Sequence, residues 1–296
     1  MKPRKIGGGL LLIPGSPSTL IKPLGGNAVV VDPGYGENRC YVIRNALKQL
    51  GLDVEAVILT HGHPDHLAEA GCLDAPIYAH RFELSIVENG LLRETVVYGA
   101  RLPRTVYSIR AEDLRVSETF EWGEKLYGFE TLALPGHSPG HTGLLDREAR
   151  TIYVGDAFFG DRLMDRVGIP FAPSHEEFLE SIEKLRPFVG QGYKFVLSHG
   201  PIVDGRRALR LLDHTAGKVR EAEKLVVELL GGKPLSLPRL SFEVTRRLSS
   251  AEAPGPELLL LNEVTLKSIV SKLVNEGLAE PVVVEGELRW KLSKTS

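Results

Sequence analysis

Residues 54–66 read VEAVILTHGHPDH and join a strand-like segment to a cluster of metal-ligand side chains. Residues 54–59 are apolar and β-branched and have the length of a buried strand. The loop that follows carries His61, His63, Asp65 and His66, at the strand end where α/β proteins place their chemistry. Imidazoles and carboxylates are the ligands that Zn²⁺ prefers. A single histidine here would more simply belong to a polar loop, but four such residues in six positions predict a metal site.

The composition is that of an ordinary globular protein. The 296 residues suffice for one large domain and a small one, or for two domains. Hydrophobic residues make up 43% and the net charge is −2, so nothing chain-wide points to nucleic acid or an anionic membrane. No segment approaches the ~18 apolar residues that span a bilayer. The N-terminal apolar run at residues 10–13 is too short for a signal sequence.

The only cysteines are Cys40 and Cys72, and they do not form a CxxC motif. They could pair with each other, but two isolated cysteines are more simply interpreted as buried structural thiols. With no membrane segment expected, this interpretation predicts a cytoplasmic protein.

Alternating strands and helices are predicted for the first two thirds of the chain. Strands are expected at residues 10–13, 19–22, 28–31, 54–59, 77–79, 125–134, 143–145, 151–154 and 194–197. Helices are expected at residues 38–50, 81–88, 174–189 and 206–230, with Gly217 as a point where the last could break. Residues 91–121 mix strand-like pieces with arginines and are interpreted as an insertion or hairpin beside the active-site mouth. Residues 157–173 are expected to form a loop.

The end of the chain predicts a separate small domain. Helices at 218–230, 239–249 and 263–276 precede a strand pair at 281–285 and 288–292, which is the winged-helix order. We therefore divide the chain into a catalytic domain, residues 1–217, and a winged-helix-like domain, residues 218–296. Residues 234–296 contain four Lys, four Arg, eight Glu and no Asp. This neutral balance favours a lid or a dimerisation element over a nucleic-acid module.

Further ligand-type residues follow other strand-like segments. Asp32, His137, Asp156 and His199 each lie at the end of an apolar run, either directly after it or one or two residues beyond it. Each alone would more simply be part of a turn, but neighbouring strands can bring all of them to one rim. We expect His61, His63 and His137 to hold one divalent ion and Asp65, His66 and His199 a second, with Asp156 bridging. Ions so paired make hydroxide available at neutral pH by lowering the pKa of a shared water toward ~7.

The remaining histidines are weaker candidates. His141 lies four residues after His137, but the ligand set is complete without it, so a supporting role is expected. His80, His175 and His214 lie outside the strand-end pattern and are expected at the surface or at helix ends.

The order Asp32, His61-x-His63-x-Asp65-His66, His137, Asp156, His199 resembles the five motifs of the metallo-β-lactamase superfamily over about residues 5–215. The resemblance implies an α/β fold, an αββα sandwich with a dinuclear site at one edge of its sheets. It also implies that Asp32 orients the ligating imidazoles. Asp32 and Asp65 are the candidate catalytic residues.

Within that superfamily the motif form resembles glyoxalase II, lactonases and nucleases. It lacks the Cys ligand of many true β-lactamases, and the flavodiiron pattern has Glu where His63 stands. Residues 198–202, His214 and the tail resemble the subgroup that includes the mitochondrial β-lactamase-like endoribonuclease. Thr215 stands where that subgroup usually has Arg.

The leading hypothesis is a dinuclear zinc hydrolase of a thioester or other acyl ester, acting on a small or short-chain substrate, with Fe or Mn as other possible metals. Three alternatives stay open: a phosphodiesterase or ribonuclease, a mononuclear iron persulfide dioxygenase, and a metal-bound regulator with a DNA-binding tail. A homodimer is also open.

Overall fold

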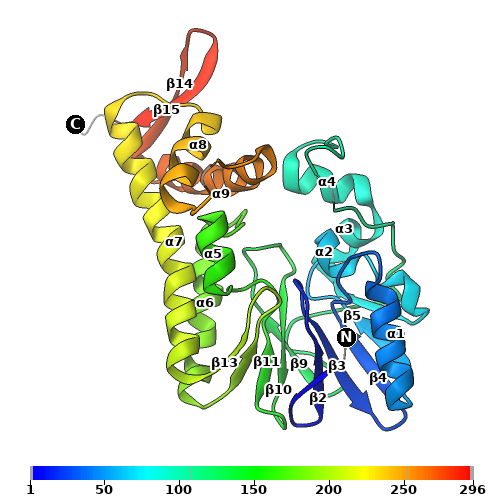
Figure 1. Cartoon of the computed structure of the whole chain (residues 1–296). Helices are drawn as coiled ribbons and strands as arrows, with labels where there is room; N and C mark the ends of the chain where they lie inside the picture. The colour runs from blue at the N-terminus through cyan, green and yellow to red at the C-terminus, as the bar shows by residue number, and fades with distance from the viewer. Residues whose placement is uncertain (1–2, 108, 252, 294–296) are drawn as a thin grey trace.

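Two β-sheets stack face to face in the lower part of Figure 1. The computed structural model of the chain describes residues 3–107, 109–251 and 253–293. In the first sheet seven strands follow chain order, with β1 to β4 antiparallel and β4 to β7 parallel. These strands are β1 (Arg4–Gly7), β2 (Leu10–Ile13), β3 (Thr19–Leu24), β4 (Asn27–Val31), β5 (Asp53–Ile58), β6 (Ile77–His80) and β7 (Glu118–Phe120).

The second sheet has six strands in the order β13-β12-β11-β10-β9-β8. Its pairs are antiparallel except β11 with β12, which run parallel. The strands are β8 (Lys125–Leu126), β9 (Phe129–Ala133), β10 (Thr142–Asp146), β11 (Thr151–Tyr153), β12 (Lys194–Val196) and β13 (Ile202–Val203).

Helices surround the sheets and form most of the C-terminal region. The α-helices are α1 (Arg39–Leu50), α2 (Pro64–Leu67), α3 (Leu84–Glu88), α4 (Gly90–Tyr98), α5 (Asp161–Val167), α6 (His175–Gly190), α7 (Gly205–Gly232), α8 (Leu237–Leu248) and α9 (Pro256–Asn275). Short 3₁₀ turns lie at η1 (Gly71–Leu73) and η2 (Arg81–Glu83). The hairpin β14 (Ala279–Val284) and β15 (Glu287–Leu292) follows α9.

Strict alternation of apolar side chains creates the layers, because successive strand residues point to opposite faces. In β4, Val29 and Val31 point between the sheets, whereas Ala28 and Val30 pack under α1. In the other sheet, Tyr153 points inward and its neighbour Ile152 packs toward α6 and α7. The resulting order is helix, sheet, sheet, helix, so the predicted αββα sandwich is confirmed.

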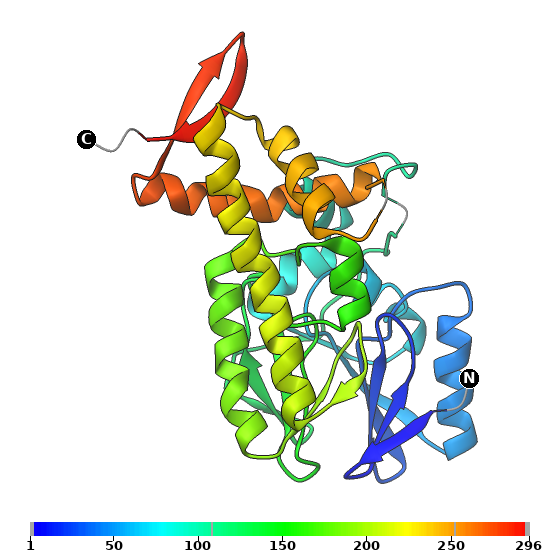
Figure 2. The same cartoon turned by 60° about the vertical axis from the view of Figure 1, so that its left-hand side comes forward.

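The C-terminal region has a hydrophobic core of its own, built from α8, α9 and the second half of α7. The long helix α7 runs beside α6 and continues into this region (Figure 2). Val219 packs in the core of the second sheet and Ala222 in the C-terminal core, so the packing partner of α7 changes within one turn. The proposed boundary between residues 217 and 218 lies inside this helix. The boundary and the winged-helix assignment stay predictions.

Most predicted elements are present, but five expectations about them were wrong. Residues 125–134 do not form one strand: they form the antiparallel pair β8 and β9, which turns at Tyr127 and Gly128, both with positive φ. Residues 91–121 do not form a hairpin: they begin with α4, which Asn89 caps by accepting a hydrogen bond from the Leu92 amide and which Gly99 ends in a left-handed conformation. Residues 157–173 contain α5. Helix α9 begins seven residues early because Pro256 occupies its first turn, where proline is favourable. Helix α7 is unbroken at Gly217, since the buried Ala216 and Val219 hold it in place.

Cys40 and Cys72 form a disulfide between α1 and η1, so the expectation of two separate thiols was wrong. The sequence could not show this, because the 32-residue separation is closed only when α1 packs beside η1. In the described part of the chain, no helix has both the length and the apolar character needed to cross a membrane.

Two glycine substitutions should change stability in opposite directions. Gly217→Ala should raise the free energy of unfolding by up to about 1 kcal/mol, because a methyl group there meets nothing within 4 Å and alanine is the better helix former. Gly136→Ala should lower it by at least about 2 kcal/mol, because Gly136 has φ +114° and its Cβ would lie 2.2 Å from the Phe178 amide nitrogen. Urea unfolding followed by circular dichroism measures both, and a shift in the same direction would contradict the packing.

The disulfide predicts a thiol count. Protein prepared without reductant and unfolded in guanidinium should show no reactive thiol, and two after reduction. Reduction should lower the free energy of unfolding by on the order of 3 kcal/mol, because it releases a closed loop of this length in the unfolded chain. Two thiols in the unreduced protein would show that the pair does not form.

Candidate metal centre

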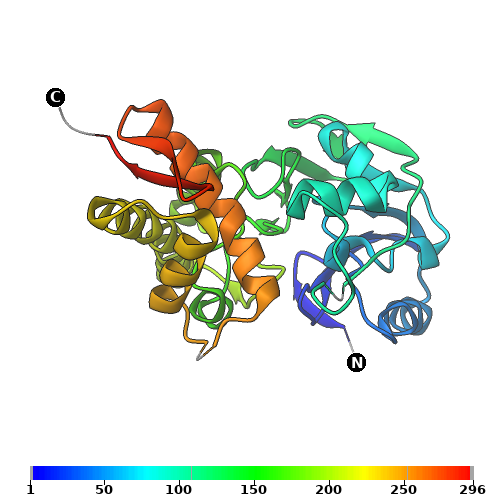
Figure 3. The same ribbon diagram turned by 90° about the horizontal axis from the view of Figure 1, so that it is seen from above.

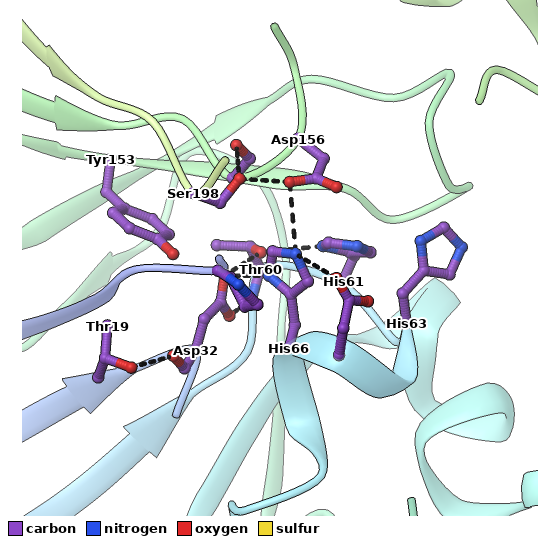
Figure 4. Close-up of polar contacts among 12 residues, drawn as sticks. Thr19, Asp32, Thr60, His61, His63, His66, Tyr153, Asp156 and Ser198 are labelled. Atoms are coloured by element: carbon purple, nitrogen blue, oxygen red, sulfur yellow. Dashed lines mark hydrogen bonds and ion pairs between the residues drawn. The ribbon is translucent and has the colours of Figure 1, made fainter. Parts of the chain in front are cut away.

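The predicted ligands meet at one edge of the sandwich, where strands of both sheets end (Figure 4). The loop after β5 supplies His61, His63, Asp65 and His66, with the last two in the short helix α2. Strands β9, β11 and β12 are followed by His137, Asp156 and His199. The structure brings all seven residues together.

One group consists of His61, His63 and His137. Each offers a ring nitrogen, and these atoms lie within 4.8 Å of one another. His63 Nδ1 and His137 Nε2 are 2.9 Å apart. The three imidazoles therefore lie close enough to share one ion, and their assignment as its ligands stays a prediction.

A second group consists of Asp65, His66 and His199. The Nε2 atoms of the two histidines are 3.4 Å apart, and Asp65 Oδ2 lies 3.2 Å from His199 Nε2. Asp156 lies between the groups. Its Oδ1 is 3.3 Å from His66 Nε2, and its Oδ2 is 3.3 Å from His137 Nε2 and 3.6 Å from His199 Nε2. Its two oxygens thus contact both groups.

The two groups contain five histidines. In four of them a hydrogen bond at Nδ1 sets the orientation of the ring. His61 Nδ1 lies 3.0 Å from Thr60 Oγ1, and His66 Nδ1 lies 2.8 Å from Asp32 Oδ2. His137 Nδ1 lies 2.9 Å from the Phe171 carbonyl oxygen, and His199 Nδ1 lies 2.7 Å from Ser16 Oγ. Such contacts fix the tautomer and orientation of a ligating imidazole. They leave Nε2 of each ring free to face the centre.

Asp32 makes the largest number of these supporting hydrogen bonds. It is fully buried, and its carboxylate accepts hydrogen bonds from the Thr60 amide at 2.9 Å, the Thr60 hydroxyl at 2.7 Å and His66 Nδ1 at 2.8 Å. Thr60 in turn contacts His61. Asp32 touches the ligand loop and not the centre itself, which is the orienting position that the resemblance implied.

The C-terminal region is linked to the centre by hydrogen bonds around Phe171, whose carbonyl oxygen contacts His137. Thr265 of α9 donates to the Pro170 carbonyl at 2.9 Å, and its hydroxyl accepts from the Ala172 amide at 2.9 Å. These two bonds flank Phe171, whose carbonyl oxygen holds His137. A helix at the end of the chain therefore helps position a candidate ligand.

The electrostatics differ between the two groups. Burial and the neighbouring imidazoles lower the pKa of His61 and His63, and burial lowers that of His137, so these rings are neutral. Burial also opposes a charge on His66 and His199, yet Asp156 and Asp65 raise the pKa of both rings. Burial would raise the pKa of Asp65, but His66 and His199 hold it at about 2.

These residues fit divalent cations. His61 Nε2 is buried, and among the described residues it has no hydrogen-bond partner. A cation would satisfy this nitrogen and would replace the protons that two carboxylates otherwise hold on His66 and His199. The donor set of imidazoles and carboxylates suits Zn²⁺, Fe or Mn.

The other histidines have structural partners. His141 accepts from the Asp156 amide at 2.9 Å and donates to the Leu134 carbonyl at 2.9 Å, so both its nitrogens are occupied and it supports the loop of Asp156. His80 and His175 lie at helix starts, as expected. His214 is in the middle of α7 and faces Asp161 at 3.1 Å.

Glu83 is a residue beside the candidate centre that sequence reasoning missed. This buried carboxylate accepts from the Gly62 amide at 2.8 Å, the Gly140 amide at 2.6 Å and the Ser138 hydroxyl at 2.7 Å. It ties the 61–66 loop to the loop of His137. Its place just after β6, another strand end at the same sheet edge, was the one available signal.

A cavity of about 290 Å³ opens over the centre. Its walls come from the ligand loops, α4 with the segment after it, α5, residues 169–171 and the start of α9. The segment 91–121 does line the mouth of the site, as predicted, although as a helix and an irregular stretch.

Removing the charge of Asp32 should weaken metal binding. Asp32→Asn keeps the shape but loses an acceptor for Thr60 or His66, so zinc affinity should fall about 10- to 100-fold. Competition with a chromophoric chelator measures the affinity. Asp74→Asn, with a side chain 79% exposed, is the control and should leave affinity unchanged. Equal affinity of Asp32→Asn and the control would contradict the orienting role.

Comparison with known proteins agrees with this geometry. The family model of the metallo-beta-lactamase superfamily matches residues 14–197. Hydroxyacylglutathione hydrolase GloC of Haemophilus influenzae is 30% identical over 142 residues, covering 45% of this chain and 62% of that protein, so the chain spans less than two thirds of this relative. The hydroxyacylglutathione hydrolase of Alkalilimnicola ehrlichii is 29% identical over 270 residues, covering 89% of each.

Solved structures share the fold over nearly the full length. A beta-lactamase domain protein from Burkholderia ambifaria aligns with a TM-score of 0.71 at 18% identity, covering 98% of this chain and 93% of its own. A metallo-beta-lactamase family protein from Thermus thermophilus aligns with a TM-score of 0.70 at 19% identity, covering 96% and 99%. The chain belongs to the metallo-β-lactamase superfamily.

Proposed function

We propose that this protein is a hydrolase that uses two divalent metal ions, most simply Zn²⁺, to cleave a thioester or another acyl ester. The observation that carries the proposal is the position of Asp156, whose two carboxylate oxygens contact His66, His137 and His199 from both ligand groups. We assign His61, His63 and His137 to one ion and Asp65, His66 and His199 to the other.

When bound, two such ions lower the pKa of a shared water from 15.7 toward ~7 and stabilise the negative charge that develops on a substrate. The chain's own residues prepare the site for this. Asp32, Ser16 and the Phe171 carbonyl hold the imidazoles in place. The centroid of the Phe171 ring lies 5.3 Å from that of His63 and 5.6 Å from that of His137, so the ring packs edge-on against both imidazoles.

An acyl substrate is supported by the two relatives described above, both of which are named as hydroxyacylglutathione hydrolases. The net charge of −2 supports the same choice over a polyanionic substrate. A cytoplasmic location stays a prediction, and the disulfide between Cys40 and Cys72 removes the argument from free thiols on which it was based.

A phosphodiesterase or ribonuclease is the second candidate, favoured by the helices and hairpin of the tail. Four basic side chains of the tail could form a nucleic-acid face, and each of them makes an ion pair with a glutamate. The pairs are Lys267 with Glu263 at 3.3 Å, Lys272 with Glu223 at 2.6 Å, Arg289 with Glu287 at 2.7 Å and Lys291 with Glu280 at 2.9 Å. These pairs reduce the positive charge available to phosphates, so we rank this function below ester hydrolysis. Cleavage of single-stranded RNA would reverse the order.

The persulfide dioxygenase alternative makes a different prediction for the metal. It requires one iron per chain, held by His61, His137 and Asp156, and oxygen uptake on a persulfide. Metal analysis showing one or two zinc ions per chain would exclude the dioxygenase.

The metal-bound regulator with a DNA-binding tail is the last alternative. Specific binding of duplex DNA without any hydrolysis would favour it.

Replacing Asp156 should abolish function. Asp156→Ala removes the carboxylate that contacts both groups, so ester hydrolysis should fall by more than the ~100-fold that loss of an outer partner costs. Metal content per chain should fall with it. Turnover of a thioester and lactone panel, with mass spectrometry of bound metal, measures both.

Asp213→Ala is the matched control, because its side chain is 64% exposed and contacts Arg186 away from the centre. It should retain both metal and activity. Undiminished ester hydrolysis by wild-type protein stripped of metal would overturn the proposed function.

A further inference from the structure

The cavity over the metal centre is mainly apolar. Leu163 and Met164 of α5 form one wall, Phe171 a second, and Leu258 and Leu261 of α9 a third. Helix α9 approaches α4 across the top of the molecule (Figure 3), and Val97 of α4 closes the opposite side. Hydrocarbon side chains from the middle and the end of the chain therefore face one space beside the candidate ligands.

These walls are held in place by specific hydrogen bonds. The Asn262 amide of α9 donates to the Val167 carbonyl at 3.0 Å and to Thr245 Oγ1 at 2.9 Å. Thr265, one turn further along α9, bonds to both sides of Phe171. Because Asn262 and Thr265 are buried, these contacts fix the distance between the α9 wall and the metal loops. The shape of the apolar cavity is therefore set by buried hydrogen bonds.

Charged groups in the lining are few. Apart from Asp65 and Asp156 of the centre and its histidines, the described residues of the lining include one cation, Arg166, and one further acid, Glu257. A glutathione thioester would bring two carboxylates and an ammonium group to this surface. Placing such charges against hydrocarbon without partners is costly. Among the described lining residues only one arginine can form an ion pair with the carboxylates, although the hydroxyl groups of Tyr35, Tyr98 and Tyr107 could donate hydrogen bonds to them.

We propose that the cavity binds a hydrocarbon chain, so that the substrate is an ester or thioester with an apolar chain of medium length beside the scissile carbonyl. This inference rests on the proposed function and names its substrate class. A volume of about 290 Å³ is at the lower end of ligand-binding cavities, which suits a single chain and not a large ring system. The carbonyl lies at the metal centre, and the chain lies against Leu163, Leu258 and Leu261.

Hydrolysis should depend on chain length. Each added methylene buried in the cavity should raise kcat/KM on the order of three- to fourfold until the space is filled. We would measure kcat/KM of the zinc-loaded enzyme for acetyl, butyryl, hexanoyl and octanoyl thioesters of N-acetylcysteamine, and for S-lactoylglutathione. A second series of acetate esters with lengthening alcohols distinguishes a chain on the acyl side from one on the alcohol side.

A binding measurement is independent of turnover. The uncleavable octyl thioether of N-acetylcysteamine should bind at least about tenfold more tightly than the ethyl thioether in isothermal titration calorimetry. Its heat-capacity change should be negative, which is the mark of buried apolar surface.

Variants locate the effect. Leu258→Gln and Leu261→Gln each place a polar group in the α9 wall, so the ratio of kcat/KM for the octanoyl thioester to kcat/KM for the acetyl thioester should fall about tenfold. Val283→Gln, at a hairpin position 75% exposed and outside the lining, should leave this ratio unchanged. Thermal unfolding confirms that each variant is folded, and the wild-type length series tests the inference even if one is not.

The outcomes separate this inference from the proposed function. Chain-length-dependent binding without hydrolysis of any ester would overturn the function and support the apolar cavity. Hydrolysis without dependence on chain length, equal binding of the two thioethers, or preference for S-lactoylglutathione over the octanoyl thioester would overturn the apolar cavity and leave the function standing.

Discussion

The site depends on hydrogen bonds made on the far side of each imidazole. A buried histidine with a free ring can rotate, whereas one whose Nδ1 is held must present Nε2 in a fixed direction. Asp32 provides this hold for His66 and, through Thr60, for His61. Ser16 and the Phe171 carbonyl do the same for His199 and His137. The protein fold alone therefore places the candidate ligands close together, without a bound metal.

The same constraint links the C-terminal region to the chemistry. Thr265 bonds on both sides of Phe171, and Phe171 holds His137, so α9 is connected to the centre through three hydrogen bonds. Removing residues 234–296 would take away this support together with the α9 wall of the cavity. Loss of activity after such a truncation would not reveal a nucleic-acid role for the tail, and single substitutions are needed to separate positioning from substrate contact.

The clustering of the candidate ligands was predictable because each follows a strand, and parallel or neighbouring strands have their ends at one sheet edge. Their partners were less so. The Phe171 carbonyl is a backbone atom with no sequence signature, and Ser16 meets His199 across 183 positions only after folding. Helix α4 was missed although Asn89 and Gly99 marked its ends, because arginines obscured its pattern. One of them, Arg93, is buried and donates to three carbonyls, an inward role that charge alone does not suggest.

The continuity of α7 has a consequence for how a substrate enters. Its 28 residues form a rod of roughly 42 Å that packs against the second sheet at one end and inside the C-terminal core at the other. Such a rod cannot serve as a hinge without breaking its own hydrogen bonds. The C-terminal region is therefore held at a fixed angle to the second sheet, so any movement that admits a substrate must come from another wall of the cavity, such as α4, Tyr107 or Ile109.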